Sequence, residues 1–171
     1  CKAPAAWSDY ENAPFRPPDR IQPRRVQRGN DSSMPPTDSG TPPRVLVIGS
    51  INMDLVARVP AIPRPGETLT GHSLDFIPGG KGANQAVAAA RLGAQVSIAG
   101  RLGDDAFSAT LRQGLTAAGI DTTAVLATPN TASGTAWISV ANDGQNAITV
   151  IPGSNGAVSV EDVARWEPII A

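Results

Sequence analysis

The chain has 171 residues, a formal net charge of −1 and 41% hydrophobic residues, which suits one globular domain of ordinary size. The near-neutral charge argues against a protein that binds nucleic acid or an anionic membrane, and no apolar run reaches the length of a membrane-spanning helix. The single cysteine, Cys1, excludes an intramolecular disulfide framework and a cysteine-cluster metal site, and it fits a reducing cytoplasm.

Residues 1–43 differ in composition from the rest of the chain. They hold nine of the 16 prolines, with six basic and five acidic residues and almost no aliphatic ones. Such a segment cannot bury enough apolar surface to offset the conformational entropy lost on ordering. We therefore expect a disordered Pro/Arg-rich leader over 1–43, followed by a globular part over 44–171. Met34 is a candidate for the true start of translation.

From Arg44 onward the pattern is that of an α/β protein. The continuous apolar run over 45–48 predicts a strand buried on both faces, as in a parallel sheet. The other predicted elements, in chain order, are an Ala-rich helix over 82–92 ended by Gly93, a strand over 95–99, and a helix capped by Asp104 or Asp105 and ended by Gly119. This alternation of strand and helix predicts a sheet with right-handed crossover connections.

Two regions, near 55–76 and 135–151, do not fit that alternation. Each contains two short strand-like segments, over 55–59 and 67–76 in the first region and over 135–141 and 147–151 in the second. Asp143-Gly144 between the last two is a strong hairpin signal. We predict that the four segments form a small antiparallel sheet apart from the main one. Beyond them, Ser159 and Asp162 are spaced to start a last helix.

The first group of residues that could carry chemistry is Gly79-Gly80-Lys81-Gly82-Ala83-Asn84-Gln85, at the start of the first helix. Free N–H groups and the positive end of the helix dipole lie at such a start, glycines allow a ligand close to the backbone, and Lys81 adds a charge. The spacing matches neither a Walker A phosphate loop nor a dinucleotide fingerprint. The alternative is a glycine-rich helix cap with a solvated lysine.

The second group is Gly49-Ser50-Ile51-Asn52-Met53-Asp54, which follows the first predicted strand. Ligands of open α/β sheets bind beyond the carboxyl ends of the strands. Asn52 and Asp54 are two residues apart, so in an extended chain they face the same side. A carboxylate and an amide together suit the recognition of neighbouring hydroxyl groups. The alternative is an Asx-turn that leads the chain out of the strand.

Together these groups resemble the ribokinase family of carbohydrate kinases. The N-terminal signature of that family is matched by Gly79, Gly80, Gly82, Asn84, Ala86, Gly93 and Gly103 at the family's spacing. The blocks over 49–54, 65–68 and 80–86 are most similar to the members that phosphorylate ribose, and the resemblance runs from about Val45 to the end of the chain. It implies a three-layer Rossmann-like α/β fold, truncated here, with a small antiparallel β lid.

The resemblance also implies site residues and a reaction. In the family, the residues that match Asn52, Asp54, Gly80, Lys81 and Asn84 hold the sugar hydroxyls, and we place Gly79 beside them. The implied reaction transfers the γ-phosphoryl group of ATP to the terminal hydroxyl of D-ribose, with Mg²⁺ and a monovalent cation such as K⁺. The lid also pairs two subunits into a homodimer in this family, so the resemblance implies the same here.

The chain departs from the family pattern in one respect. The second family signature, with its anion hole and the Asp that acts as general base, has no counterpart in this sequence, so we expect no catalytic residue and no metal ligand here and no kinase activity from the chain alone. Two alternatives stay open: another sugar or nucleoside kinase of the same family, and a non-catalytic module that binds sugar or dimerises.

Overall fold

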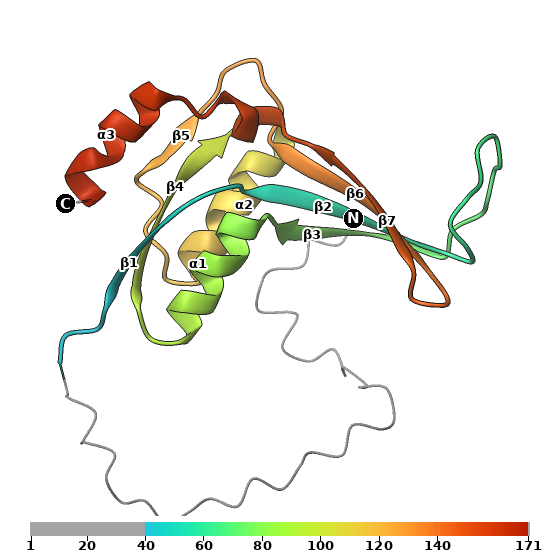
Figure 1. Ribbon diagram of the computed structural model, residues 1–171, viewed down its shortest axis with the longest axis horizontal. Helices are drawn as coiled ribbons and strands as arrows, with labels where there is room; N and C mark the ends of the chain where they lie inside the picture. The colour runs from blue at the N-terminus through green and yellow to red at the C-terminus, as the bar shows by residue number, and fades with distance from the viewer. Residues whose placement is uncertain (1–39, 171) are drawn as a thin grey trace, which may run out of the picture.

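The computed structural model describes residues 40–170, so nearly all of the predicted leader over 1–43 lies outside the described residues. The described part contains a three-stranded sheet and a separate four-stranded sheet, which extends to one side of the first in Figure 1. The predicted α/β fold with a small additional sheet is therefore confirmed.

The three-stranded sheet is parallel and has a helix layer on each face. It consists of β1 (Arg44–Ile48), β4 (Gln95–Leu102) and β5 (Val125–Ala127), in the order β1-β4-β5. The helices α1 (Lys81–Arg91) and α2 (Ala106–Ala117) lie on one face, and α3 (Val160–Ile170) lies on the other (Figure 1). Successive residues of a strand face opposite sides, and accordingly Ile98 joins the core under α1 and α2 whereas Ala99 contacts the cluster around Trp166 of α3.

The helices α1 and α2 lie where the sequence predicted, although α1 begins and ends one residue before the predicted range of 82–92. The small residues Ala83 and Ala86 of α1 are fully buried, which brings this helix close to the sheet. Asp105 is the N-cap of α2, because its carboxylate accepts a hydrogen bond from the backbone N–H of Ser108 at 3.2 Å. Asp104 instead accepts from the backbone of the loop before β6, at residues 130 and 131.

The burial of β1 differs from the prediction. The run over 45–48 was expected to be buried on both faces, but Ile48 is 46% exposed and its three neighbours are only partly buried. The reason is that β1 pairs with β4 along one side and with no other strand among the described residues. β1 is thus an apolar edge strand in this part of the chain.

The four-stranded sheet is mixed rather than antiparallel. Its strands are β2 (Asn52–Val59), β3 (Ser73–Gly79), β6 (Gly134–Ala141) and β7 (Asn146–Ile151), in the order β3-β2-β6-β7. The outer pairs are antiparallel as predicted, but the central pair β2–β6 is parallel. The antiparallel prediction was wrong for this pair because a long crossover through α1, β4, α2 and β5 brings the chain back to the same end of the sheet.

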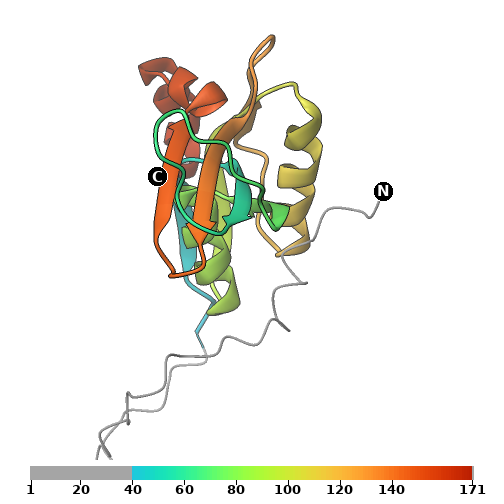
Figure 2. The ribbon, with the colours of Figure 1, turned by 90° about the vertical axis from the view of Figure 1, so that its right-hand side faces the viewer.

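The first two strands of this sheet also have different bounds from those predicted. The segment over 67–76 was expected to be a strand, but residues 60–72 form a loop and pairing resumes where His72 donates its backbone N–H to the carbonyl of Arg58 at 2.7 Å. Within the loop, Glu67 closes a turn by accepting from the backbone N–H of Arg64 at 2.9 Å. In Figure 2 this loop crosses in front of β6 and β7.

Candidate functional site

A cavity of about 330 Å³ opens where the chain leaves β1, where α1 begins and where the four-stranded sheet starts. Its polar lining is Ser50, Asn52, Asp54, Lys81, Asn84 and Asn155, and the remaining lining is Gly80, Ala136, Ile138, Ile148, Val150 and Pro152. Five of the six predicted site residues therefore surround one cavity. The groups that form hydrogen bonds make up a polar wall, and the aliphatic side chains of β6 and β7, which lie beside β2 in the same sheet, make up an aliphatic wall.

Asn52 and Asp54 reach the cavity from the first three residues of β2. They lie two residues apart on this strand and face the same side, as the sequence predicted. The alternative of an Asx-turn is wrong, because Asn52 is already paired with Gly79 of β3 and with Gly134 of β6. Pairing on both sides makes this strand a rigid support for the two side chains.

The start of α1 lies directly against the residues that follow β1. The backbone N–H of Ala83 donates to the carbonyl of Ser50 at 3.1 Å. Gly80, the N-cap, has a φ of 95°, and a Cβ there would lie 2.6 Å from the same carbonyl oxygen. Only glycine fits this position, both for its backbone angle and for its space. The close contact places Lys81 and Asn84, both exposed, at the mouth of the cavity.

Gly79 has a different position from the other five predicted residues. It is buried at the end of β3 and does not line the cavity. A Cβ on Gly79 would collide with the carboxylate of Asp54. Gly79 therefore makes room for the Asp54 side chain rather than facing a ligand.

Burial and charge act in opposite directions on Asp54. Partial burial raises the pKa of its carboxyl above the ordinary value of 3.8, and the nearby positive charge of Lys81 offsets part of that rise. The first turn of α1 contains no acidic residue and no side-chain cap, so the positive end of its dipole is also free to act on the cavity. The site thus combines an acceptor-only carboxylate, a donor-only ammonium and amides that can do either.

This combination suits a small molecule with several hydroxyl groups. Each hydroxyl both donates and accepts, so it can bridge a carboxylate and an amide or an ammonium. A cavity of this volume lies at the small end of the usual range for ligand sites, about 300–1,000 Å³. Among the described residues no group of three or more His, Cys, Asp or Glu side chains could hold a metal ion.

The sequence interpretation missed Asn155. This residue lies in η2 (Gly153–Ala157), the short 3₁₀ turn after β7, and it is 103 residues away from Asn52, to which it is hydrogen-bonded at 2.8 Å. No local pattern indicates such a contact. The only signal is that it follows a strand and the Pro152-Gly153 pair, which is typical of a turn.

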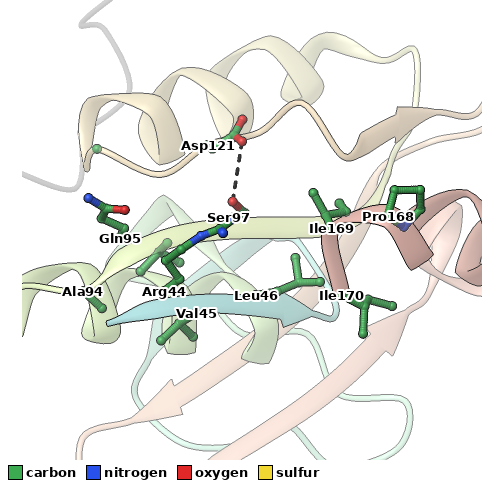
Figure 3. Close-up of a pocket in the computed structure, with 12 residues that line it drawn as sticks. Arg44, Val45, Leu46, Ala94, Gln95, Ser97, Asp121, Pro168, Ile169 and Ile170 are labelled. Atoms are coloured by element: carbon green, nitrogen blue, oxygen red, sulfur yellow. Dashed lines mark hydrogen bonds between the residues drawn. The ribbon is translucent and has the colours of Figure 1, made fainter. Parts of the chain in front are cut away.

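A second, larger hollow of about 640 Å³ lies elsewhere, at the opposite end of the parallel sheet (Figure 3). It is lined by the first residues of β1 and β4 and by the end of α3, and in the figure Ile170 lies near the tip of β1. Ligands of open α/β sheets bind at the carboxyl ends of the strands, not at the amino ends. Its location therefore distinguishes this hollow from the candidate site.

Comparison with known proteins agrees with this geometry. The model of the family described as "pfkB family carbohydrate kinase" matches residues 42–169. The chain belongs to this family. Within the residues that the structure describes, no helix is long and apolar enough to cross a membrane.

Individual members of the pfkB family show the same similarity. The chain is 47% identical to the ribokinase of Bacillus subtilis over 115 residues, which are 67% of the chain and 39% of that protein. It is 42% identical to the deoxyribokinase of Salmonella typhimurium over 121 residues, or 71% of the chain and 40% of that protein. A solved structure of Arabidopsis thaliana ribokinase complexed with ribose and ATP superposes with a TM-score of 0.62 at 32% identity, covering 73% of this chain and 42% of that one.

The chain spans about two fifths of the length of the curated pfkB relatives that it matches. The fold of the matched part is the α/β fold that the sequence predicted.

Proposed function

We propose that this chain forms the sugar-binding part of a ribokinase, an enzyme that transfers the γ-phosphoryl group of ATP to the terminal hydroxyl of D-ribose and yields ribose 5-phosphate. The observation that carries the proposal is the single cavity that brings Asn52, Asp54, Gly80, Lys81 and Asn84 together. The match with the pfkB family and with ribokinases supports the choice of reaction.

The polar wall of the cavity orients the sugar. The ionised carboxylate of Asp54 accepts hydrogen bonds from sugar hydroxyls, and Lys81 donates to hydroxyl oxygens. Asn84, one turn into α1, adds an amide from a second direction. Holding the hydroxyls from β2 and α1 at once fixes the sugar in one orientation, and such positioning is a main source of rate acceleration in phosphoryl transfer.

The aliphatic wall excludes water from the sugar. Ala136 and Ile138 of β6 and Ile148 and Val150 of β7 face the cavity from the four-stranded sheet. Ile148 and Val150 are 55% and 58% exposed, so this sheet has apolar surface left to cover. We propose that it acts as a lid over the sugar, and that a second copy of the protein covers the remaining apolar surface to form a homodimer.

The cosubstrate and the cations need residues other than these. ATP would supply the phosphoryl group, and Mg²⁺ and a monovalent cation such as K⁺ would neutralise the charge that develops on it. The start of α1 lacks the spacing of a phosphate loop, and the described residues form no cluster of metal-binding side chains. Since the chain spans about two fifths of its curated relatives, we assign the ATP site and the general base to the part of those relatives that it does not match. We propose a cytoplasmic location for the whole enzyme.

The proposal is tested by comparing two proteins. Purified 171-residue chain, supplied with ATP, Mg²⁺, K⁺ and D-ribose, is expected to bind ribose without phosphorylating it, whereas the product of the complete gene is expected to form ribose 5-phosphate. Phosphorylation of ribose by the chain alone would contradict the assignment of catalysis to other segments. A complete gene product that binds ribose but phosphorylates no sugar would point to a non-catalytic binding module.

The choice of sugar needs a separate comparison. One relative is a deoxyribokinase at a similar level of identity to the ribokinases. We expect D-ribose to be a better substrate than 2-deoxy-D-ribose, measured as kcat/KM for the complete gene product. The reverse preference would assign the protein to the second sugar.

A further inference from the structure

Asn155 connects the turn after β7 with the strand that carries the sugar-binding residues. Its Oδ1 accepts a hydrogen bond from the backbone N–H of Ile51 at 3.0 Å. Its Nδ2 lies 3.2 Å from the carbonyl oxygen of Ile51, 3.2 Å from that of Pro152, and 2.8 Å from Oδ1 of Asn52. One side chain thus satisfies both backbone groups of the residue before Asn52 and also contacts the Asn52 side chain.

The backbone groups of Ile51 and Pro152 determine the orientation of the side-chain amides of both Asn155 and Asn52. The N–H of Ile51 can only donate, so the atom of Asn155 that faces it must be the oxygen. The carbonyls of Ile51 and Pro152 can only accept, so the other atom must be the NH₂ nitrogen. Asn52 faces that NH₂ group and must therefore offer its own oxygen to it. The NH₂ group of Asn52 is left for the cavity.

Gly134 shows that the pair of amides is closely packed. A Cβ on Gly134 would collide with Nδ2 of Asn155 and would lie 2.5 Å from Oδ1 of Asn52. Gly134 is the first residue of β6 and is paired with Asn52 in the sheet. The Asn52 side chain is itself buried, at 9% exposure. No side chain other than the hydrogen of glycine fits beside the two amides, so any atom added at Gly134 would separate them.

We propose that Asn155 is a positioning residue that holds the Asn52 side chain with its NH₂ group toward the sugar. This inference rests on the proposed function of the cavity. Asn52 then donates to a hydroxyl oxygen, while Asp54, two residues on and on the same face, accepts from a hydroxyl. A hydroxyl between them can do both at once. The resulting donor–acceptor pair favours a hydroxyl over a group that only donates or only accepts.

The orientation is tested first without any sugar. Hydrogen exchange of side-chain NH₂ groups is measured by NMR on ¹⁵N-labelled chain, with exposed Asn142 as the reference for an unprotected amide. In the unsubstituted chain the NH₂ group of Asn155 is expected to exchange slowly and that of Asn52 to exchange faster, because the latter faces the open cavity. Protection of the Asn52 NH₂ group in the unsubstituted chain would overturn the inference directly.

The variant Asn155→Asp is expected to reverse the Asn52 amide. The new carboxylate still accepts from the N–H of Ile51, but it cannot donate to Asn52. Asn52 should therefore turn its NH₂ group toward position 155, and slow exchange should now be found at Asn52. Asn142→Asp is the matched control, because it adds the same charge on an exposed turn. Unchanged exchange at Asn52 in a folded Asn155→Asp variant would also refute the inference.

The second arm measures D-ribose affinity by calorimetry. Asn155→Ala and Asn155→Asp are each expected to weaken ribose binding about tenfold, the loss typical of one misdirected hydrogen bond. In an Asn52→Ala background, Asn155→Ala should have no further effect, because Asn155 acts through Asn52. An equal further loss in that background would show that Asn155 contacts the sugar itself, which contradicts a positioning role.

Gly134→Ala provides an independent perturbation of the same contact, and Gly156→Ala is its control, since a Cβ on Gly156 meets only an ordinary contact of 3.5 Å. We expect weaker ribose binding for the first and unchanged binding for the second. If the unsubstituted chain binds no sugar, the proposed function fails and the exchange measurement alone judges the inference. If it binds ribose and the Asn155 variants bind it equally well, the inference fails and the proposed function stands.

Discussion

The substitution Asp162→Ala should strongly destabilise the fold, because Asp162 joins β4 to α3 through a buried ion pair. Its side chain is 1% exposed and accepts two hydrogen bonds of 2.7 Å from Arg101, at Nε and Nη2. Asp162 also accepts from the backbone N–H of Ser159 at 3.0 Å, which caps the start of α3. The alanine variant loses all three bonds and, among residues 40–170, leaves the Arg101 charge with Thr128 as its one side-chain partner, at 3.1 Å.

The magnitude follows from these contacts. Removing one partner of a buried ion pair typically costs about 3–5 kcal/mol. The Arg101 side chain is 16% exposed, so water reaches the remaining charge and the lower end, about 3 kcal/mol, applies to the pair. Loss of the helix cap adds about 1 kcal/mol. The total of about 4 kcal/mol is a large share of the roughly 5–15 kcal/mol by which proteins are stable.

The assay is urea unfolding of the 171-residue chain, followed by circular dichroism. With an m-value of about 2 kcal/mol/M, the midpoint of Asp162→Ala should fall by roughly 2 M. Glu167→Ala, on the exposed side of the same helix, is the control and should change little. The double variant Arg101→Met with Asp162→Leu removes both charges and should recover most of the loss. Equal midpoints for Asp162→Ala and Glu167→Ala would refute this reasoning.

The same pair predicts a dependence on pH. The hydrogen bonds from Arg101 hold the pKa of Asp162 below its ordinary value of 3.8, so the ionised form is favoured in the folded state. Its stabilisation is therefore fully present above about pH 3.8 and is lost as pH falls through the lower folded pKa. The difference in midpoint between the unsubstituted chain and Asp162→Ala should shrink only below that pH.

Three further predictions concern the site and its supports. Burial raises the pKa of Asp54 above 3.8, so its charge opposes folding at neutral pH. Asp54→Asn should therefore raise the urea midpoint at pH 7, with no gain below pH 3.8, and should weaken ribose binding. A lower midpoint at pH 7 would contradict this. Gly80→Ala should abolish ribose binding in calorimetry and should lower the urea midpoint more than Gly93→Ala does. Gly93 is the control because it has a similar φ of 90° but open space around a Cβ. Equal losses for the two variants would exclude the close contact as the cause. Asp105→Ala should lower the free energy of unfolding in urea by about 2 kcal/mol, since it removes a helix cap and two hydrogen bonds from buried Ser133. Asp105→Asn keeps one acceptor oxygen and should recover part of that loss. An equal loss in both variants would show that these accepted hydrogen bonds are not the reason.

Much of the fold was predictable because the signals that define it are local. Gly93 and Gly119 end their helices at positive φ, and the alanine face of α1 and the aspartate cap of α2 are both found as the sequence indicated. Such signals act within one or two turns, so neighbouring residues reveal them. The same holds for the Asp143-Gly144 turn between β6 and β7.

The features that were not predictable depend on contacts between distant segments. The parallel pairing of β2 with β6 is set by a crossover of about 75 residues, and the partial burial of β1 depends on which strands lie beside it. The contact of Asn155 with Asn52 belongs to the same class. The segments over 49–54 and 79–85 were joined into one site through their resemblance to a known family, whereas its aliphatic wall and its support at Asn155 come from the far end of the described chain and were not foreseen.

Calorimetric titration of D-ribose into the 171-residue chain and its Asp54→Ala variant at neutral pH tests the central claim most directly. We predict saturable binding of one ribose per chain, weakened by about tenfold or more when the carboxylate is removed. A chain that retains its folded circular dichroism spectrum yet binds no ribose, or binds it with the same affinity after Asp54→Ala, would show that the cavity is not a sugar site.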